Sequence, residues 1–151
     1  MTMLNFSWRA LDRLHALVGR AVRRHRSYSS VGLVGGTTHR VDGAELPIAH
    51  RLKDLILQAK GTQVKRIILF GSRARGDARP DSDFDLLVVL HDIRPEQKHA
   101  ELLTLYRALE SAGVAAEPWV MSEEEFEETK SVIGGLAHPA WKEGVVLYEN
   151  P

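Results

Sequence analysis

Apolar residues recur every three or four positions over residues 7–25, a spacing that predicts an amphipathic helix. Its apolar stripe consists of Trp8, Leu11, Leu14, Val18 and Val22. Serine and glycine are frequent over residues 27–45, which is typical of a loop or linker. We therefore expect residues 1–45 to form a helical and linker extension, and residues 46–151 to form a compact domain.

The first elements of the compact domain are predicted to be a helix and two strands. The helix is expected to begin near Leu46, because Pro47 suits a first helical turn, and to end at Gly61. Two apolar runs, Val64 to Phe70 and Asp83 to Leu90, indicate strands. A loop rich in glycine, proline and aspartate separates them.

The rest of the chain continues to alternate between helix and strand signals. A helix is predicted over residues 95–111 and a third strand from Val114 to Met121. Ser122 and Glu125 have the spacing of a capping box for the next helix. The last signals are a break at Gly134-Gly135, a short helix near Pro139 and a strand from Val145 to Tyr148. The order α-β-β-α-β-α-β predicts an α+β fold, a mixed sheet with helices packed against it.

Composition narrows the class of protein. The chain has 151 residues, 44% of them hydrophobic and 26% charged, as in a soluble globular protein with one core. The absence of cysteine excludes disulfides, thiolate zinc sites and cysteine nucleophiles, and fits a reducing cytoplasm. No apolar run approaches the roughly 18 residues of a membrane helix. We therefore expect a cytoplasmic protein without a membrane partner.

The two parts of the chain differ in charge although the net charge is zero. Residues 1–60 carry ten Lys/Arg against four Asp/Glu, and residues 61–151 carry ten against sixteen. An acidic body argues against broad nucleic-acid binding, because that affinity comes mainly from neutralised phosphates. Nucleic acid is expected only indirectly, through a partner or through the basic N-terminal helix. A basic extension on an acidic domain is the simpler interpretation.

The candidate chemistry lies between the first two predicted strands. Ten residues separate Ser72 from Asp83. Side chains at positions i and i+2 of a strand share a face, so Asp83 and Asp85 converge, whereas Phe84 and Leu86 face apolar packing. At about 6 Å and an effective dielectric near 20, two carboxylates repel by on the order of 3 kcal/mol. Such a pair is expected to have a compensating cation.

The ligand types favour a magnesium–phosphate site. Mg²⁺ is typically held by one or two carboxylates together with substrate phosphates. Glycine lets the backbone approach a phosphate closely, and Ser72 adds a hydroxyl. Arg73 and Arg75 are candidate phosphate partners. A bare Asp-x-Asp usually means surface acids, but its position at a strand start, after a Gly-Ser turn and an Arg-rich loop, favours function.

Gly71-Ser72, ten residues and then Asp83-x-Asp85 resemble the defining motif of the DNA polymerase β-like nucleotidyltransferase superfamily. The string from Gly71 to Leu86 resembles its minimal branch, which includes MntA-type antitoxins paired with HEPN toxins. The similarity covers about residues 46–149. It implies a palm-like nucleotidyltransferase fold for this part, and residues 1–45 fall outside it.

The resemblance also implies a third carboxylate on a later strand, and the matching position is Glu117. Many relatives have aspartate there, and here Pro118 follows, so an edge-strand surface acid is the alternative. The resemblance implies two Mg²⁺ ions, with Asp83, Asp85 and Glu117 as their ligands. The implied phosphate-binding residues are Gly71, Ser72, Arg73 and Arg75.

The implied reaction is transfer of a nucleoside monophosphate, expected to be AMP from ATP, to a hydroxyl acceptor. Asp83 and Asp85 would hold the metal for an in-line displacement, and Glu117 would help deprotonate the acceptor. In the resembled antitoxins the acceptor is a tyrosine of the HEPN toxin. Two other functions stay open: an antitoxin that acts by binding alone, and a transferase acting on a small molecule such as an aminoglycoside.

Overall fold

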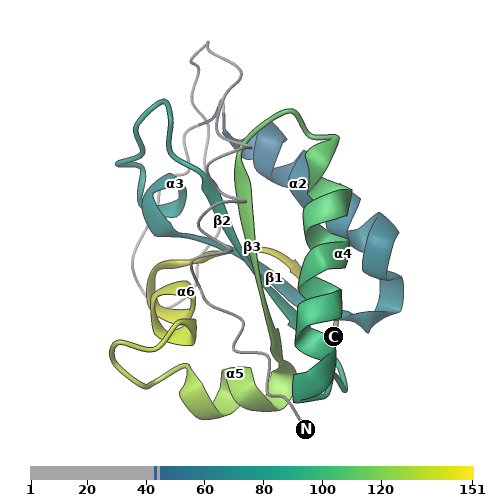
Figure 1. The fold of residues 1–151 in the computed structure, drawn as a ribbon. Helices are drawn as coiled ribbons and strands as arrows, with labels where there is room; N and C mark the ends of the chain where they lie inside the picture. The colour runs from purple at the N-terminus through teal and green to yellow at the C-terminus, as the bar shows by residue number, and fades with distance from the viewer. Residues whose placement is uncertain (1–42, 44) are drawn as a thin grey trace, which may run out of the picture.

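The computed structural model describes residue 43 and residues 45–151 of the chain (Figure 1). The predicted helix over residues 7–25 lies outside the described residues, as does nearly all of the predicted linker. Helix α2, Leu46–Lys60, begins where the sequence predicts a domain start and is followed by Gly61. None of the helices in the described part of the chain is long and apolar enough to cross a membrane.

A four-stranded sheet with the order β3-β2-β1-β4 forms the centre of the domain. Strand β1, Val64–Phe70, runs antiparallel to β2, Phe84–Leu90, and to β4, Val145–Glu149. Strand β3, Ala116–Ser122, pairs with β2 in parallel. A parallel pair needs a crossover, and helix α4, Lys98–Glu110, provides it. The predicted mixed sheet and α+β class are confirmed.

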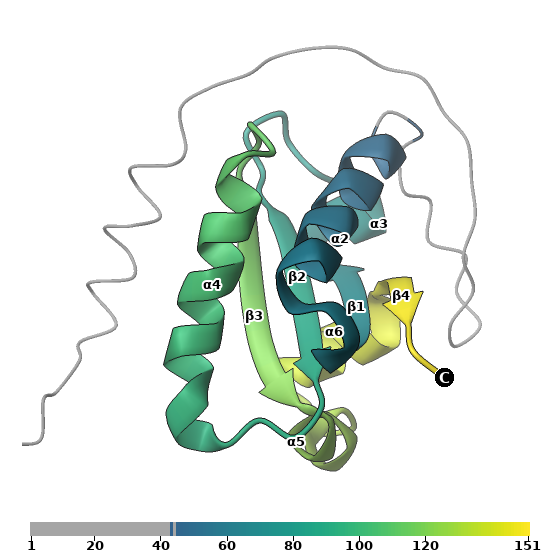
Figure 2. The same cartoon turned by 90° about the vertical axis from the view of Figure 1, so that its right-hand side faces the viewer.

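Helices cover both faces of the sheet. Helices α2 and α4 lie on one face, where they cover alternate residues of β1 and β2 (Figure 2). The remaining helices are α3, Gly71–Arg75, α5, Glu123–Thr129, and α6, Ala137–Glu143. The second face carries a smaller core that includes Phe126 of α5 and two alanines of α6. Because α3 leaves β1 directly, the sheet places it at the end where β2 begins.

Local sequence signals explain most helix ends. The Ser122 hydroxyl accepts a hydrogen bond of 3.1 Å from the Glu125 backbone N–H, which confirms the predicted N-terminal cap. The helix predicted from Pro95 starts with a 3₁₀ turn, Pro95–Gln97, before α4. Helix α6 begins at Ala137, ahead of Pro139. Proline is tolerated there because the first-turn N–H groups have no partner within the helix.

The sequence pattern did not predict the short helix α3. Its five residues are too few for a hydrophobic period, so the segment read as part of a loop. Only its ends carry a signal. Gly71 has φ of 70° and Gly76, with φ of 80°, ends the helix in the left-handed conformation.

Candidate active site

Glycine 71 and Asp85 meet where β1 gives way to α3. Phe70, the last residue of β1, pairs with Asp85 of β2. A Cβ atom added to Gly71 would lie 2.2 Å from Asp85 Oδ2, closer than side-chain carbons approach other atoms. Gly71 also has φ of 70°, a conformation that L-residues rarely adopt. The backbone therefore passes directly beside this carboxylate at a position where both the space and the backbone conformation favour glycine.

The register of β2 and β3 brings a second acid beside Asp85. Asp85 pairs with Glu117 across the parallel ladder, so their side chains lie on the same face of the sheet. Phe84 and Leu86, on either side of Asp85, point to the opposite face and are 2% and 0% exposed. The predicted apolar packing of Phe84 and Leu86 is confirmed. Asp83 lies one residue before the strand begins.

The three carboxylates act on one another electrostatically. The pKa of Asp85 is raised to about 6, first by burial and then by the negative charges of Glu117 and Asp83, while the positive charge of Arg75 opposes the shift. The pKa of Tyr106, on α4, is raised to about 12 by burial and by the charges of Glu117 and Asp83. The negative charges of Asp83 and Glu117 therefore act on both the Asp85 carboxyl and the Tyr106 hydroxyl.

The donor set fits a hard divalent cation that a substrate helps to hold. Within residues 45–151 no three His, Cys, Asp or Glu side chains are arranged as a ready metal site. Mg²⁺ does not need such a cage, because it typically takes one or two carboxylates and completes its shell with phosphates and water. Asp83 and Asp85 are two carboxylates of this kind, and the negative charge of Asp83 acts on Asp85.

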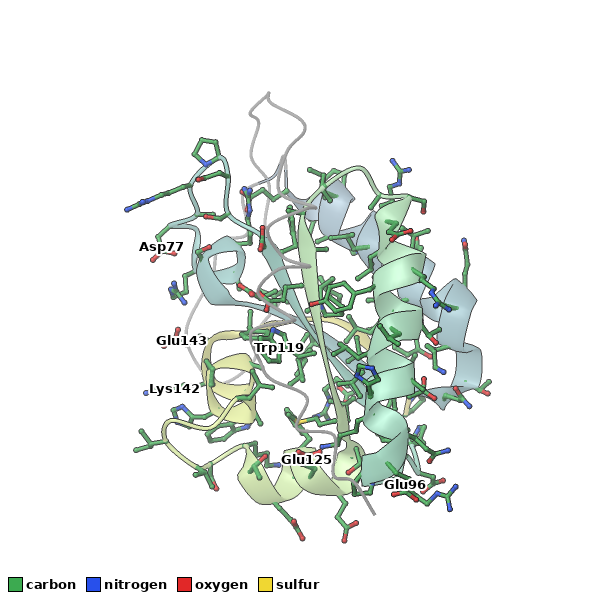
Figure 3. All side chains as sticks on the ribbon, in the orientation of Figure 1. Asp77, Glu96, Trp119, Glu125, Lys142 and Glu143 are labelled. Carbon is green, nitrogen blue, oxygen red and sulfur yellow. The ribbon has the colours of Figure 1, made fainter. Side chains whose placement is uncertain are left out.

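The two arginines of the loop have different surroundings. The Arg75 side chain is 41% exposed, and its guanidinium lies 3.3 Å from Asp77 and 4.0 Å from Glu143. Figure 3 shows Asp77 and Glu143 at the same edge of the molecule. The positive charge of Arg75 therefore acts on Asp85, and its side chain remains accessible to solvent, as a phosphate ligand must be. The Ser72 carbonyl accepts hydrogen bonds from the Gly76 and Asp77 amides and closes α3.

The Arg73 side chain is only 13% exposed and turns into the protein. Its guanidinium donates to the Ser82 carbonyl from Nη2 at 2.7 Å and from Nε at 3.1 Å. It also forms an ion pair of 2.5 Å with Glu45. Arg73 was expected among the phosphate ligands, and the structure instead commits its donors to protein acceptors.

A cavity of about 630 Å³ opens beside Glu117. Its walls come from α4, β3, α5 and the segment that follows α5. Tyr106 and Trp119 line it, and the Trp119 Nε1–H is buried without a hydrogen-bond acceptor in the described part of the protein. Figure 3 places Trp119 between α6 and α4. No sequence signal indicated this cavity or the position of Tyr106 beside it.

A family model described as polymerase beta, nucleotidyltransferase, matches residues 53–151. A candidate nucleotidyltransferase from Sulfolobus solfataricus has a similar structure, with 20% identity, a TM-score of 0.53, and coverage of 71% of this chain and 82% of the other. At that identity the likeness shows the fold alone. No curated protein matches the chain.

Two further solved structures are toxin–antitoxin complexes. One, with AMP-PNP, shows 19% identity and a TM-score of 0.44 over 67% of this chain and 73% of the other. The second contains a tri-AMPylated Shewanella oneidensis HEPN toxin with an MNT antitoxin. It shows 17% identity and a TM-score of 0.39 over 68% of this chain and 71% of the other.

Proposed function

Because the chain belongs to the polymerase β nucleotidyltransferase family, we propose that it transfers a nucleoside monophosphate from an NTP to a hydroxyl group. The reaction is Mg²⁺-dependent, with ATP as the donor and AMP as the transferred group. The observation that carries this proposal is the meeting of Gly71 with Asp85, while Glu117 is in register on the next strand.

Asp83 and Asp85 would bind Mg²⁺, which supplies positive charge to the triphosphate and to the attacking and leaving oxygens. Both acids must be ionised to bind a cation, and the pKa of about 6 for Asp85 still permits this at neutral pH. The Gly71-Ser72 turn offers backbone and hydroxyl donors to the β- and γ-phosphates. Arg75 lies close enough to add a positive charge there.

Glu117 is proposed to act on the acceptor. As the acceptor oxygen forms a bond to the α-phosphorus, the bond from that phosphorus to the pyrophosphate oxygen breaks. The acceptor proton passes to the Glu117 carboxylate, and pyrophosphate leaves with the bonding electrons. The placement of Glu117 supports this role, because it lies beside Asp85 and at the wall of the cavity where an acceptor can enter.

The acceptor is proposed to be a tyrosine of a HEPN-type toxin, which would make the protein an antitoxin. The support is the motif string from Gly71 to Leu86, which resembles that of MntA-type antitoxins. One solved complex, of an MNT antitoxin with a tri-AMPylated HEPN toxin, provides the precedent for this chemistry in another protein. Contact with nucleic acid would then be indirect, through the toxin.

Two observations favour specific alternatives. Glutamate at position 117, together with the lack of a ready three-carboxylate cluster in residues 45–151, favours an antitoxin that acts by binding alone. The cavity beside Glu117 has a volume within the range of small-molecule sites, which favours a small acceptor such as an aminoglycoside. Its mostly apolar walls suit an aromatic acceptor better than a polycationic sugar.

The deciding experiment measures transfer of label from ATP labelled at the α-phosphate. The protein, Mg²⁺ and the product of the neighbouring gene are incubated, and label on each protein is counted. Label on the partner in the wild type, lost in Asp83→Asn, supports transfer. The matched control is Asp81→Asn, an exposed acid of the same loop that should retain activity.

Each alternative has its own outcome in the same experiment. A tight complex with the partner but no label supports binding alone. Label on kanamycin in a parallel reaction, with none on the partner, supports the small-molecule transferase. Equal loss of label in Asp81→Asn and Asp83→Asn would contradict the assigned role of Asp83.

A further inference from the structure

We infer that Arg73 is a positioning residue that fixes Asp83 at the mouth of the site, with Glu45 as its anchor. Arg73 is the third residue of α3, and Asp83 lies at the far end of the loop that follows α3. The loop has no regular secondary structure over residues 77–83, so other contacts must hold its end in place.

The Arg73 guanidinium contacts both neighbours of Asp83 in the chain. Its Nε and Nη2 atoms both donate to the Ser82 carbonyl, and Nη2 also lies 3.5 Å from the Pro80 carbonyl. The face of the guanidinium lies 4.8 Å from the centre of the Phe84 ring. Phe84 is 2% exposed and belongs to the core. The contact of the guanidinium with its ring therefore holds Arg73, and the loop bonded to Arg73, against the core.

Glu45 provides the opposite anchor. Its Oε1 atom accepts from Arg73 Nη1 at 2.5 Å, and its side chain is 14% exposed. Its Oε2 atom is buried without a hydrogen-bond donor among the described residues. The positive charge of Arg73 therefore balances the negative charge of a carboxylate that has little contact with water. Because Glu45 directly precedes α2, the pair also links the start of the domain to the metal-binding loop.

This geometry requires arginine. Only a planar guanidinium can donate two bonds to one carbonyl, pair with a carboxylate on its other edge and stack on a ring. Lysine could keep the ion pair but not the fork or the stack. Because the N–H donors of Arg73 bind Ser82 and Glu45, Arg75 is the arginine of this loop that is available to a phosphate.

Hydrogen exchange on the full chain tests the claim without requiring activity. Two backbone amides report on the position of Asp83: Ser82, bonded to the Arg79 carbonyl, and Phe84, bonded to the Ala115 carbonyl. Arg73→Met should speed exchange at both by at least about tenfold. Exchange in the centre of β1 should stay at the wild-type rate, because that region is fixed by the sheet. Exchange of the two reporters at the wild-type rate would overturn the inference.

Matched variants separate positioning from general destabilisation. Arg79→Gln removes an exposed arginine from the same loop and should leave exchange unchanged. Glu45→Gln should speed exchange at Ser82 and Phe84 less than Arg73→Met does, because the fork to Ser82 remains. If Arg79→Gln has the same effect as Arg73→Met, the effect is one of loop charge and the inference fails.

The functional part of the inference rests on the proposed function. Binding of Mn²⁺ in the presence of a non-hydrolysable ATP analogue should weaken about 10- to 100-fold in Arg73→Met and only slightly in Arg79→Gln, as for other residues that orient metal ligands. Undiminished affinity in Arg73→Met would contradict a role in positioning Asp83. If the wild type binds no Mn²⁺–nucleotide, the proposed function fails, while the exchange rates still decide whether Arg73 holds the loop.

Discussion

Replacing Gly71 with alanine tests the geometry of the site most directly. The added methyl group would lie 2.2 Å from Asp85 Oδ2 and 3.1 Å from Asp85 Cγ. The backbone at residue 71 has φ of 70°, so alanine is strained there whatever space surrounds it. The variant therefore combines two effects, a backbone strain and a steric displacement of one carboxylate.

The two effects differ in size and in what they change. The strain should lower the free energy of unfolding by about 1–2 kcal/mol. The steric effect is relieved by rotation of the Asp85 side chain, because the nearest atom is at its free end, so it adds little to the loss of stability. It moves the carboxylate by roughly 1 Å, however, and a misplacement of that size can lower activity about 100-fold.

Gly113 provides a matched control. It also has φ of 70°, but a Cβ atom there would meet nothing within 4 Å. Gly113→Ala should therefore lose similar stability, measured by urea unfolding, and keep both transfer activity and Mg²⁺–nucleotide affinity. Gly71→Ala should lose both functions at a similar stability. If the two variants transfer AMP equally well, the contact between Gly71 and Asp85 has no functional importance and the reasoning is refuted.

Three further results are expected. Asp85→Asn should abolish transfer and should raise the free energy of unfolding at pH 7.5 by about 1–2 kcal/mol after screening. The reason is that the raised pKa of Asp85 makes the wild type less stable as pH rises from about 4 to about 6. Urea unfolding of both proteins at pH 4 and pH 7.5 checks the sign, and an equal gain at pH 4 would contradict it. Glu117→Gln should slow transfer about 100-fold or more while nucleotide binding, followed by calorimetry, stays within a few-fold; a large loss of binding would instead place Glu117 among the ground-state ligands. Chelation with EDTA should stop transfer, and Mg²⁺ with ATP should raise the melting temperature of the wild type but not of Asp83→Asn.

Much of the fold could be predicted because its signals are local. The helix ending at Gly61 and the buried runs of β1 and β2 follow from composition and period, and the structure has them where expected. The alternation around Asp85 also follows from the two-residue period of a strand. These local signals, a glycine turn followed by the start of a strand, were therefore enough to assign Gly71 and Asp85 to the same predicted site.

The contacts of the site could not be predicted because they depend on register and packing. The pairing of Asp85 with Glu117 requires a parallel ladder, which the order of elements does not specify residue by residue. The charges of Glu117 and Asp83 act on Tyr106 because α4 packs against β3, and the sequence does not specify that packing. The sequence equally suggested two phosphate-binding arginines, and only the folded loop distinguishes accessible Arg75 from enclosed Arg73.

Two energetically unfavourable features, a partly buried carboxylate and a left-handed backbone, meet at Asp85 and Gly71. Asp85 is a partly buried carboxylate beside two other acids, and its raised pKa shows that the fold disfavours its charge. Gly71 holds a left-handed backbone against the same carboxylate, whereas Gly113 has the same φ in open space, as an ordinary turn residue does. A sequence selected for stability alone would replace Asp85 with a neutral residue. A ligand that requires the negative charge explains both features, so failure of Asp85→Asn to gain stability would remove this argument.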